Sequence, residues 1–138
     1  MDKLSIKINK FYLNKIIKNE KVFIKKVDNK ILLSDSYSIS IVDDKDFIYN
    51  SELFKEVSLD SFIDKLQVED YQVIDSWYVL ENKVVVLKYR GLDVLIDKKY
   101  MSLFFDKNII IKIIGDNKPV LFYEGSIIRG FVLQIKKY

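Results

Sequence analysis

Residues 5–42 read SIKINKFYLNKIIKNEKVFIKKVDNKILLSDSYSISIV and establish a pattern that the chain uses twice. A short alternating stretch comes first, then a stretch whose apolar residues lie three and four apart, then further alternating stretches. Residues 92–135 follow the same order. Alternation with period two is typical of half-buried strands, and the wider spacing is typical of amphipathic helices, so each half is predicted to be β-α-β-β-β. We therefore predict a single α+β domain over residues 1–138, with antiparallel sheets and two short helices.

The first half, about residues 4–43, is predicted to begin with a strand at residues 5–9 that leads into a helix. Asn9 is a suitable N-cap, because its side chain can accept a hydrogen bond from the first helical turn. The apolar face of this helix is expected to contain Tyr12, Leu13, Ile16 and Ile17. Three antiparallel strands are then expected at residues 22–27, 31–33 and 37–42, with a tight turn at Asp28 and Asn29.

An acidic connector, about residues 44–70, and an inserted β-hairpin, about residues 71–90, are predicted between the halves. The connector offers two short helices, one at residues 51–56 and one capped by Ser58. The hairpin strands are expected at residues 71–80 and 83–89, with the turn at Glu81 and Asn82. Trp77 lies in the first of these strands and is expected in the core, since tryptophan is a large and mostly buried side chain.

The second half, about residues 91–138, is predicted to begin with a strand at residues 92–96. Asp97 follows as the expected N-cap of a helix that contains Tyr100, Met101, Leu103, Phe104 and Phe105. Strands are then predicted at residues 108–114, 119–123 and 127–135. Pro119 has no N–H to donate, so it should begin its strand or lie at a sheet edge.

Cysteine and histidine are both absent from the chain. Their absence excludes disulfides, thiolate metal sites, cysteine nucleophiles and histidine acid–base catalysis. The four glycines are scattered, so no glycine-rich phosphate loop is present. Asp43, Asp44 and Asp46 could hold a hard cation, but their spacing does not match an EF-hand. We therefore predict no enzymatic activity, no catalytic residue, no cofactor and no metal ion.

The sequence also indicates where the protein is made and used. No apolar run approaches the ~20 residues needed to cross a bilayer, and the N-terminus lacks the features of a signal peptide. A cytoplasmic location without a membrane partner is expected. The abundance of lysine and isoleucine, with alanine and threonine absent, indicates an AT-rich coding sequence. Such a sequence is typical of a low-GC bacterium, or of a phage or mobile element in one.

Charge is unevenly distributed, although the net charge is only +3. Residues 1–30 contain nine lysines and three acids, whereas residues 31–70 contain three lysines and ten acids. Residues 71–138 are again basic, with eleven basic and seven acidic residues. This asymmetry can steer a polyanion toward one face, and it is also explained by ordinary solvated surfaces in a lysine-rich chain.

Several short motifs resemble those of DNA sliding clamps, the processivity factors of replication. KILLSDSYSI at residues 30–39 resembles the family's passage of leucine, small polar residue and aspartate before an alternating strand. In the second half, KYM at 99–101, KPVLF at 118–122 and GFVL at 130–133 are similar to the last half-domain of a bacterial clamp. The resemblance implies one clamp-like domain built from two similar halves.

The resemblance further implies that the helices of both halves line a DNA-facing surface. The candidate DNA-binding residues are then Lys10, Lys15, Lys18, Lys21, Lys98 and Lys99. Bacterial clamps join three domains in each of two subunits, so a ring of six such domains would require a homo-oligomer of this chain. The family's C-terminal Met-Pro-hydrophobic-Arg ending is LQIKKY here, so the resemblance does not carry over its partner-peptide pocket.

Two functions therefore follow from the sequence. The first is a non-enzymatic accessory protein of a phage or mobile element that associates with DNA or replication proteins. The alternative is a host-directed inhibitor that presents an acidic, DNA-like surface to a defence or replication protein. Its expected determinants are Asp43, Asp44 and Asp46. The lysines and the acids are both also explained as charges that solvate the surface.

Overall fold

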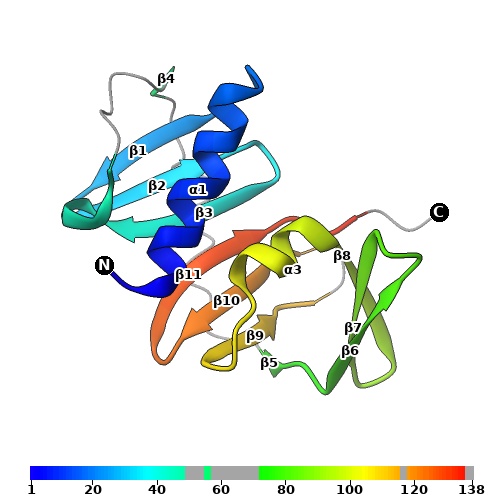
Figure 1. The fold of residues 1–138 in the computed structure, drawn as a ribbon. Coiled ribbons are helices and arrows are strands. Elements are labelled where there is room, and N and C mark those ends of the chain that lie inside the picture. Colours follow the sequence, from blue (N-terminus) through cyan, green and yellow to red (C-terminus); the bar gives the residue numbers. More distant parts are fainter. Residues whose placement is uncertain (49–54, 57–71, 116–117, 136–138) are drawn as a thin grey trace. The chain divides into compact units, whose positions relative to one another are not determined.

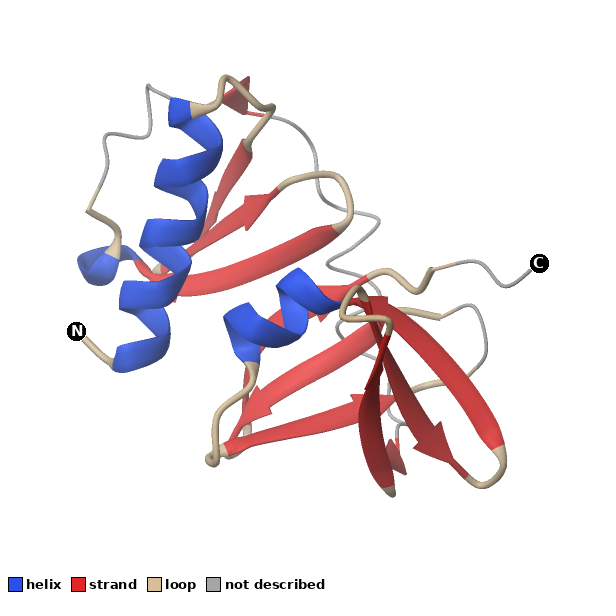
Figure 2. Cartoon of the chain, turned by 45° about the vertical axis from the view of Figure 1, so that its right-hand side comes forward, coloured by secondary structure: helices blue, strands red, loops and turns tan. Residues whose placement is uncertain are grey.

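The computed structural model describes residues 1–48, 55–56, 72–115 and 118–135 (Figure 1). These residues form helices and mainly antiparallel sheets, which confirms the predicted α+β class (Figure 2). The chain divides into two compact units, Met1–Gln67 and Val68–Tyr138. Within the described ranges, no helix has both the length and the apolar character required to cross a membrane.

The described residues of the first unit form a long helix and a small sheet with strand order β4-β1-β2-β3. Its elements are α1 (Lys3–Ile17), β1 (Phe23–Val27), β2 (Lys30–Ser34), β3 (Ser38–Asp43), the short 3₁₀ helix η1 (Asp44–Asp46) and β4 (Lys55–Glu56). The three antiparallel strands and the turn at Asp28, whose φ is 53°, confirm the prediction for residues 22–42. The connector is predicted to contain a helix at residues 51–56 and another capped by Ser58. Residues 55–56 of the first are instead a strand parallel to β1, and the remaining residues of both predicted helices lie outside the described residues.

The predicted strand at residues 5–9 is wrong, because α1 begins at Lys3. The N-cap is Asp2, whose carboxylate accepts a hydrogen bond from the Ser5 N–H at 2.7 Å. Leu4, Ile8 and Tyr12 are buried at a spacing of four, which is a helical period, whereas Ile6 is 42% exposed. Ile6 and Ile8 alternate as they would in a strand, but they lie in a helix that buries only Ile8.

Asn9 does not cap a helix but lies buried in the middle of α1. Its side-chain amide donates to the backbone oxygens of Ser5 at 2.8 Å and of Asp46 at 3.0 Å. Its side-chain oxygen accepts from the Ile48 N–H at 3.3 Å. Asn9 thus fixes the segment after β3 to the helix, which explains why a polar residue occupies the buried face.

Tyr12 makes a buried polar contact between α1 and the sheet of the first unit. Its side chain is fully buried, and its hydroxyl donates to the Leu33 carbonyl oxygen at 2.8 Å. Burial, together with the nearby Asp35 carboxylate, raises the pKa of Tyr12 above its ordinary value. The fold therefore holds this phenol in its neutral, donating form.

We expect Tyr12→Phe to lower the free energy of unfolding by about 1–3 kcal/mol at neutral pH, because the buried Leu33 carbonyl loses its donor. Since folding raises the pKa of Tyr12, its contribution is complete below about pH 10 and falls as the pH rises above that value. Urea unfolding at pH 8 and pH 11 measures this as a smaller difference between wild type and variant at pH 11. Tyr37→Phe is the matched control, because Tyr37 is 63% exposed. An unchanged difference at pH 11 would contradict the assignment.

The second unit contains a three-stranded sheet, β6-β7-β8, a helix, and strands in the order β5-β9-β10-β11 (Figure 1). Its elements are β5 (Gln72–Val73), β6 (Ser76–Leu80), β7 (Val84–Tyr89), β8 (Leu92–Asp97), α3 (Lys98–Phe104), β9 (Ile109–Ile113), β10 (Val120–Glu124) and β11 (Ile127–Val132). The predicted strand at 71–80 is wrong as one element, because β5 pairs with β9 and only β6 pairs with β7. The pair β6-β7 is also not a separate hairpin, since β8 extends the same sheet.

The turns and caps of this unit agree with the sequence prediction. Glu81 and Asn82 have φ values of 52° and 57°, and Arg90 and Gly91 have φ values of 44° and 82°. All four residues are in the left-handed region, which is common in the tight turns of hairpins. The Asp97 carboxylate accepts from the Lys99 N–H at 2.9 Å and caps α3 as predicted. Pro119 directly precedes β10, where no ladder hydrogen bond is required of it.

The core of this unit contains one unusually close approach of backbone to ring. Phe104 of α3 is fully buried and stacks on Phe122 of β10 with ring centroids 4.9 Å apart. A Cβ atom on Gly130 of β11 would lie 2.3 Å from the Phe104 ring. Gly130 is therefore required by close packing rather than by an unusual φ.

Candidate nucleic-acid interface

One exposed side of α1 carries a row of lysines. Lys3, Lys7, Lys10 and Lys18, here called the lysine face, are spaced by four, three and eight residues, and Asn14 continues the row between the last two. At 1.5 Å per residue, the row extends over about 22 Å of helix axis. Lys3, Lys10 and Lys18 are exposed, and Lys7 is half-buried. The helix and its C-cap residue Lys18 therefore present four cations in a row.

The lysine face is not neutralised by nearby acids. The sequence of α1 contains no Asp or Glu. Among the residues that the structure describes, none forms an ion pair with a lysine of this face. Several acids of the first unit instead pair with other lysines: Asp44 with Lys26 at 2.9 Å and Asp43 with Lys30. The positive charge of the lysine face is thus available to an external anion.

Lys15, a predicted DNA-binding residue, lies on a different side of α1 from Lys10 and Lys18. Its ammonium group pairs with Glu20 at 3.1 Å and Asp35 at 3.5 Å, and its side chain is 13% exposed. The Asp35 carboxylate also accepts the Tyr37 and Ser38 N–H groups, so Lys15 completes the turn between β2 and β3. Lys15 therefore has a structural role and is not part of the candidate interface. Lys21 is exposed on the segment between α1 and β1.

The two candidate lysines of the second helix have local partners in the second unit. Lys98 donates to the Asn82 side-chain oxygen and is half-buried. Lys99 is exposed and lies over the Tyr100 ring, with its ammonium 5.1 Å from the centroid. Neither contact neutralises the positive charge of the lysine, but each restricts where the ammonium group lies.

The acidic residues Asp43, Asp44 and Asp46 lie at the end of β3 and in η1. The Asp43 and Asp44 carboxylates face Lys30 and Lys26, as described above, so much of their charge is balanced within the unit. The Asp46 backbone oxygen accepts from Asn9. This arrangement supports a structural role for the cluster at the end of the sheet.

Sequence reasoning missed Lys3 and Lys7, because residues 5–9 were expected to be a strand. Two signals point to the longer helix: Asp2 is a strong N-cap residue, and Leu4, Ile8 and Tyr12 recur at a spacing of four. A helix that begins at Lys3 places Lys3, Lys7, Lys10 and Lys18 on one face.

The lysine face is suited to bind phosphate groups. Unpaired ammonium groups on a rigid helix bind phosphates as point charges, without reading base sequence.

Comparison with protein-family models, with curated proteins and with solved structures finds no match for this chain.

Proposed function

We propose that this protein is a non-enzymatic, sliding-clamp-like accessory factor, of phage or mobile-element type, that binds duplex DNA through the lysine face of α1. The observation that carries the proposal is a single helix face with four lysines, no acid on the helix and no ion pair to any of the four within the described residues. Such a face supplies the electrostatic term that dominates non-specific DNA binding.

The order of elements supports the clamp-like part of the proposal. Helix α1 is followed by the antiparallel succession β1-β2-β3, and helix α3 is followed by β9-β10-β11. Each unit therefore contains a helix and then three strands that pair in sequence order, as the two halves of a clamp domain do. The first half differs from the proposed repeat because α1 occupies the place of its leading strand.

We expect duplex binding to weaken steeply with salt. Four neutralised phosphates predict a slope of about −3.6 in a plot of log K against log salt, or about 150-fold weaker binding at 200 mM than at 50 mM KCl. Fluorescence anisotropy of a labelled 30-base-pair duplex measures this slope. A second duplex of unrelated sequence should bind equally well, because phosphate contacts carry no sequence information.

Two results would contradict the proposal. One is the absence of binding at 50 mM KCl, or binding that does not respond to salt. The other is binding to anionic phosphatidylserine vesicles without binding to duplex, because Ile6, Leu13 and Ile17 are also exposed on α1 and a basic amphipathic helix can lie on a membrane surface.

A further inference from the structure

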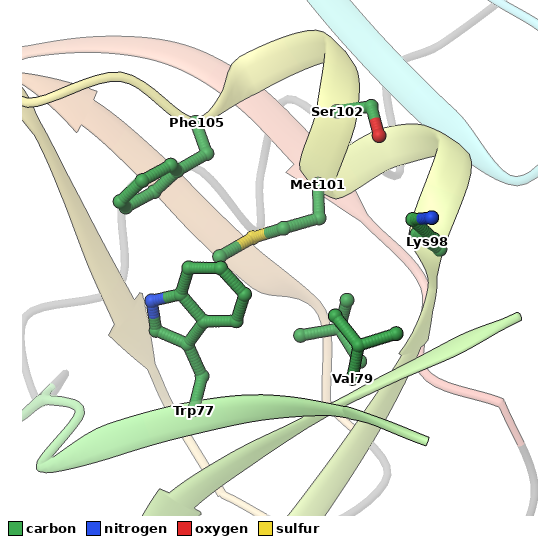
Figure 3. Close-up of a pocket in the computed structure, with 7 residues that line it drawn as sticks. Trp77, Val79, Lys98, Met101, Ser102 and Phe105 are labelled. Atoms are coloured by element: carbon green, nitrogen blue, oxygen red, sulfur yellow. The ribbon is translucent and has the colours of Figure 1, made fainter. Parts of the chain in front are cut away.

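An apolar hollow of about 220 Å³ lies in the second unit between β6, β7 and α3 (Figure 3). Trp77 and Val79 of β6 form one side, and Met101 and Phe105 form the other. Trp77 and Phe105 meet edge to face, with ring centroids 5.1 Å apart. The prediction that Trp77 lies in the core is therefore wrong. Trp77 is 38% exposed at the rim of this hollow.

The strand that borders the hollow is a sheet edge without the usual protection. In the order β6-β7-β8, β6 is terminal, and all five of its residues are exposed. Its sequence, SWYVL, contains no charge and no proline, and its register with β7 has no bulge. Within the described part of the chain, no strand pairs with its outer side. Natural edge strands usually carry one of these protections, so an unprotected edge is suited to accept another strand.

Charge at the hollow indicates what kind of strand fits. Among the described residues that line it, Lys98 is the only charged one. In Figure 3, Trp77 and Phe105 lie at one end of the hollow and Lys98 at the other. Trp77 and Val79 are two residues apart on β6, so they share a face and lie about 6.6 Å apart along the strand. The hollow thus has an apolar end at Trp77 and a cationic end at Lys98, and Val79, the next residue on the same face of β6, lies on the Lys98 side of Trp77 (Figure 3).

We propose that β6 binds an extended segment of a partner protein, which adds to the edge as a further strand. The segment carries a large apolar side chain that enters the hollow beside Trp77 and Met101. Two residues away, on the same face, it carries an Asp or Glu that pairs with Lys98 in place of Asn82. This site lies in the second unit and is independent of DNA binding by α1.

Selection from a displayed library of random seven-residue peptides tests the proposal with the full chain as bait. The expected product is a set of proline-free peptides in which a large apolar residue and an Asp or Glu are two positions apart. Selection with Lys98→Glu should replace the acid by Lys or Arg at the same position. Lys107→Glu is the matched control, because Lys107 is an exposed lysine outside the hollow, and it should select the wild-type motif.

Trp77 gives a direct readout, because it is the only tryptophan of the chain. A selected peptide without tryptophan should shift the Trp77 emission to shorter wavelength on binding. Lys98→Glu should weaken that peptide by about tenfold. Val79→Lys, at an exposed position of β6, should abolish the shift while the circular dichroism spectrum stays that of the wild type.

Three outcomes would overturn the proposal. The first is no enrichment over a bait that carries Val79→Lys. The second is an enriched motif that Lys98→Glu leaves unchanged. The third is a concentration-dependent dimer, seen by light scattering and dissociated by Val79→Lys, because β6 would then be covered by a second copy of this chain rather than by a partner.

Discussion

Gly130→Ala is expected to lower the stability of the second unit, because an added methyl group has no room at this position. The new Cβ would lie 2.3, 2.5 and 2.6 Å from three atoms of the Phe104 ring. The ring cannot move away easily, since it is fully buried and stacked on Phe122. Overpacking of this kind costs about 1–3 kcal/mol, and the rigid surroundings favour the upper end of that range.

Thermal unfolding followed by circular dichroism measures the effect, with an expected decrease in Tm of about 10 °C. Gly115→Ala is the matched control, because a Cβ there meets nothing within 4 Å, and its effect should stay within about 0.5 kcal/mol. In the Gly130→Ala background, Phe104→Leu should recover part of the loss, because the smaller side chain vacates the space the methyl needs. Wild-type stability of Gly130→Ala would show that α3 and β11 do not pack as described.

The triple variant Lys3→Glu, Lys10→Glu, Lys18→Glu should nearly abolish duplex binding. Loss of three phosphate contacts alone predicts about 500-fold weaker binding at 100 mM salt, and three new carboxylates add repulsion. The slope of log K against log salt should become less negative by about three. The measurement is the anisotropy titration described for the wild type, repeated at each salt concentration.

A variant with the same change in net charge separates the lysine face from general electrostatics. Lys83→Glu, Lys107→Glu, Lys118→Glu reverses three exposed lysines of the second unit. Because none of these three lysines belongs to the lysine face, this variant should lose far less affinity. Equal losses in the two triple variants would mean that net charge, not the lysine face, drives binding. Lys98→Glu with Lys99→Glu then measures whether the second helix contributes.

The two proposed surfaces can fail separately. The triple variant on α1 changes no residue of the hollow, and Lys98→Glu changes no residue of the lysine face. A protein that binds selected peptides but not duplex would be a partner-binding factor without the proposed DNA function. A protein that binds duplex but selects no peptides would retain the proposed function and lose the further inference.

Features that depend on neighbouring residues in the chain can be predicted from the sequence. The turns at residues 28–29, 81–82 and 90–91 follow from Asp28, Asn82 and Gly91, whose residue types tolerate positive φ. The Asp97 cap and the strands 22–42 and 108–132 follow from local hydrogen bonding and from alternation. Each of these signals lies within a few residues of the structure that it predicts.

Features that depend on residues far apart in the sequence are set by tertiary packing. Residues 3–9 fit both a strand and a helix by pattern, and burial of Ile8 and Tyr12 together selects the helix. Whether Trp77 is buried depends on which strand lies beside β6, and whether β5 belongs to the hairpin depends on β9, nearly forty residues later. The need for glycine at position 130 comes from the Phe104 ring on another element. Such contacts have no local signature, because the residues that make them are brought together only by folding.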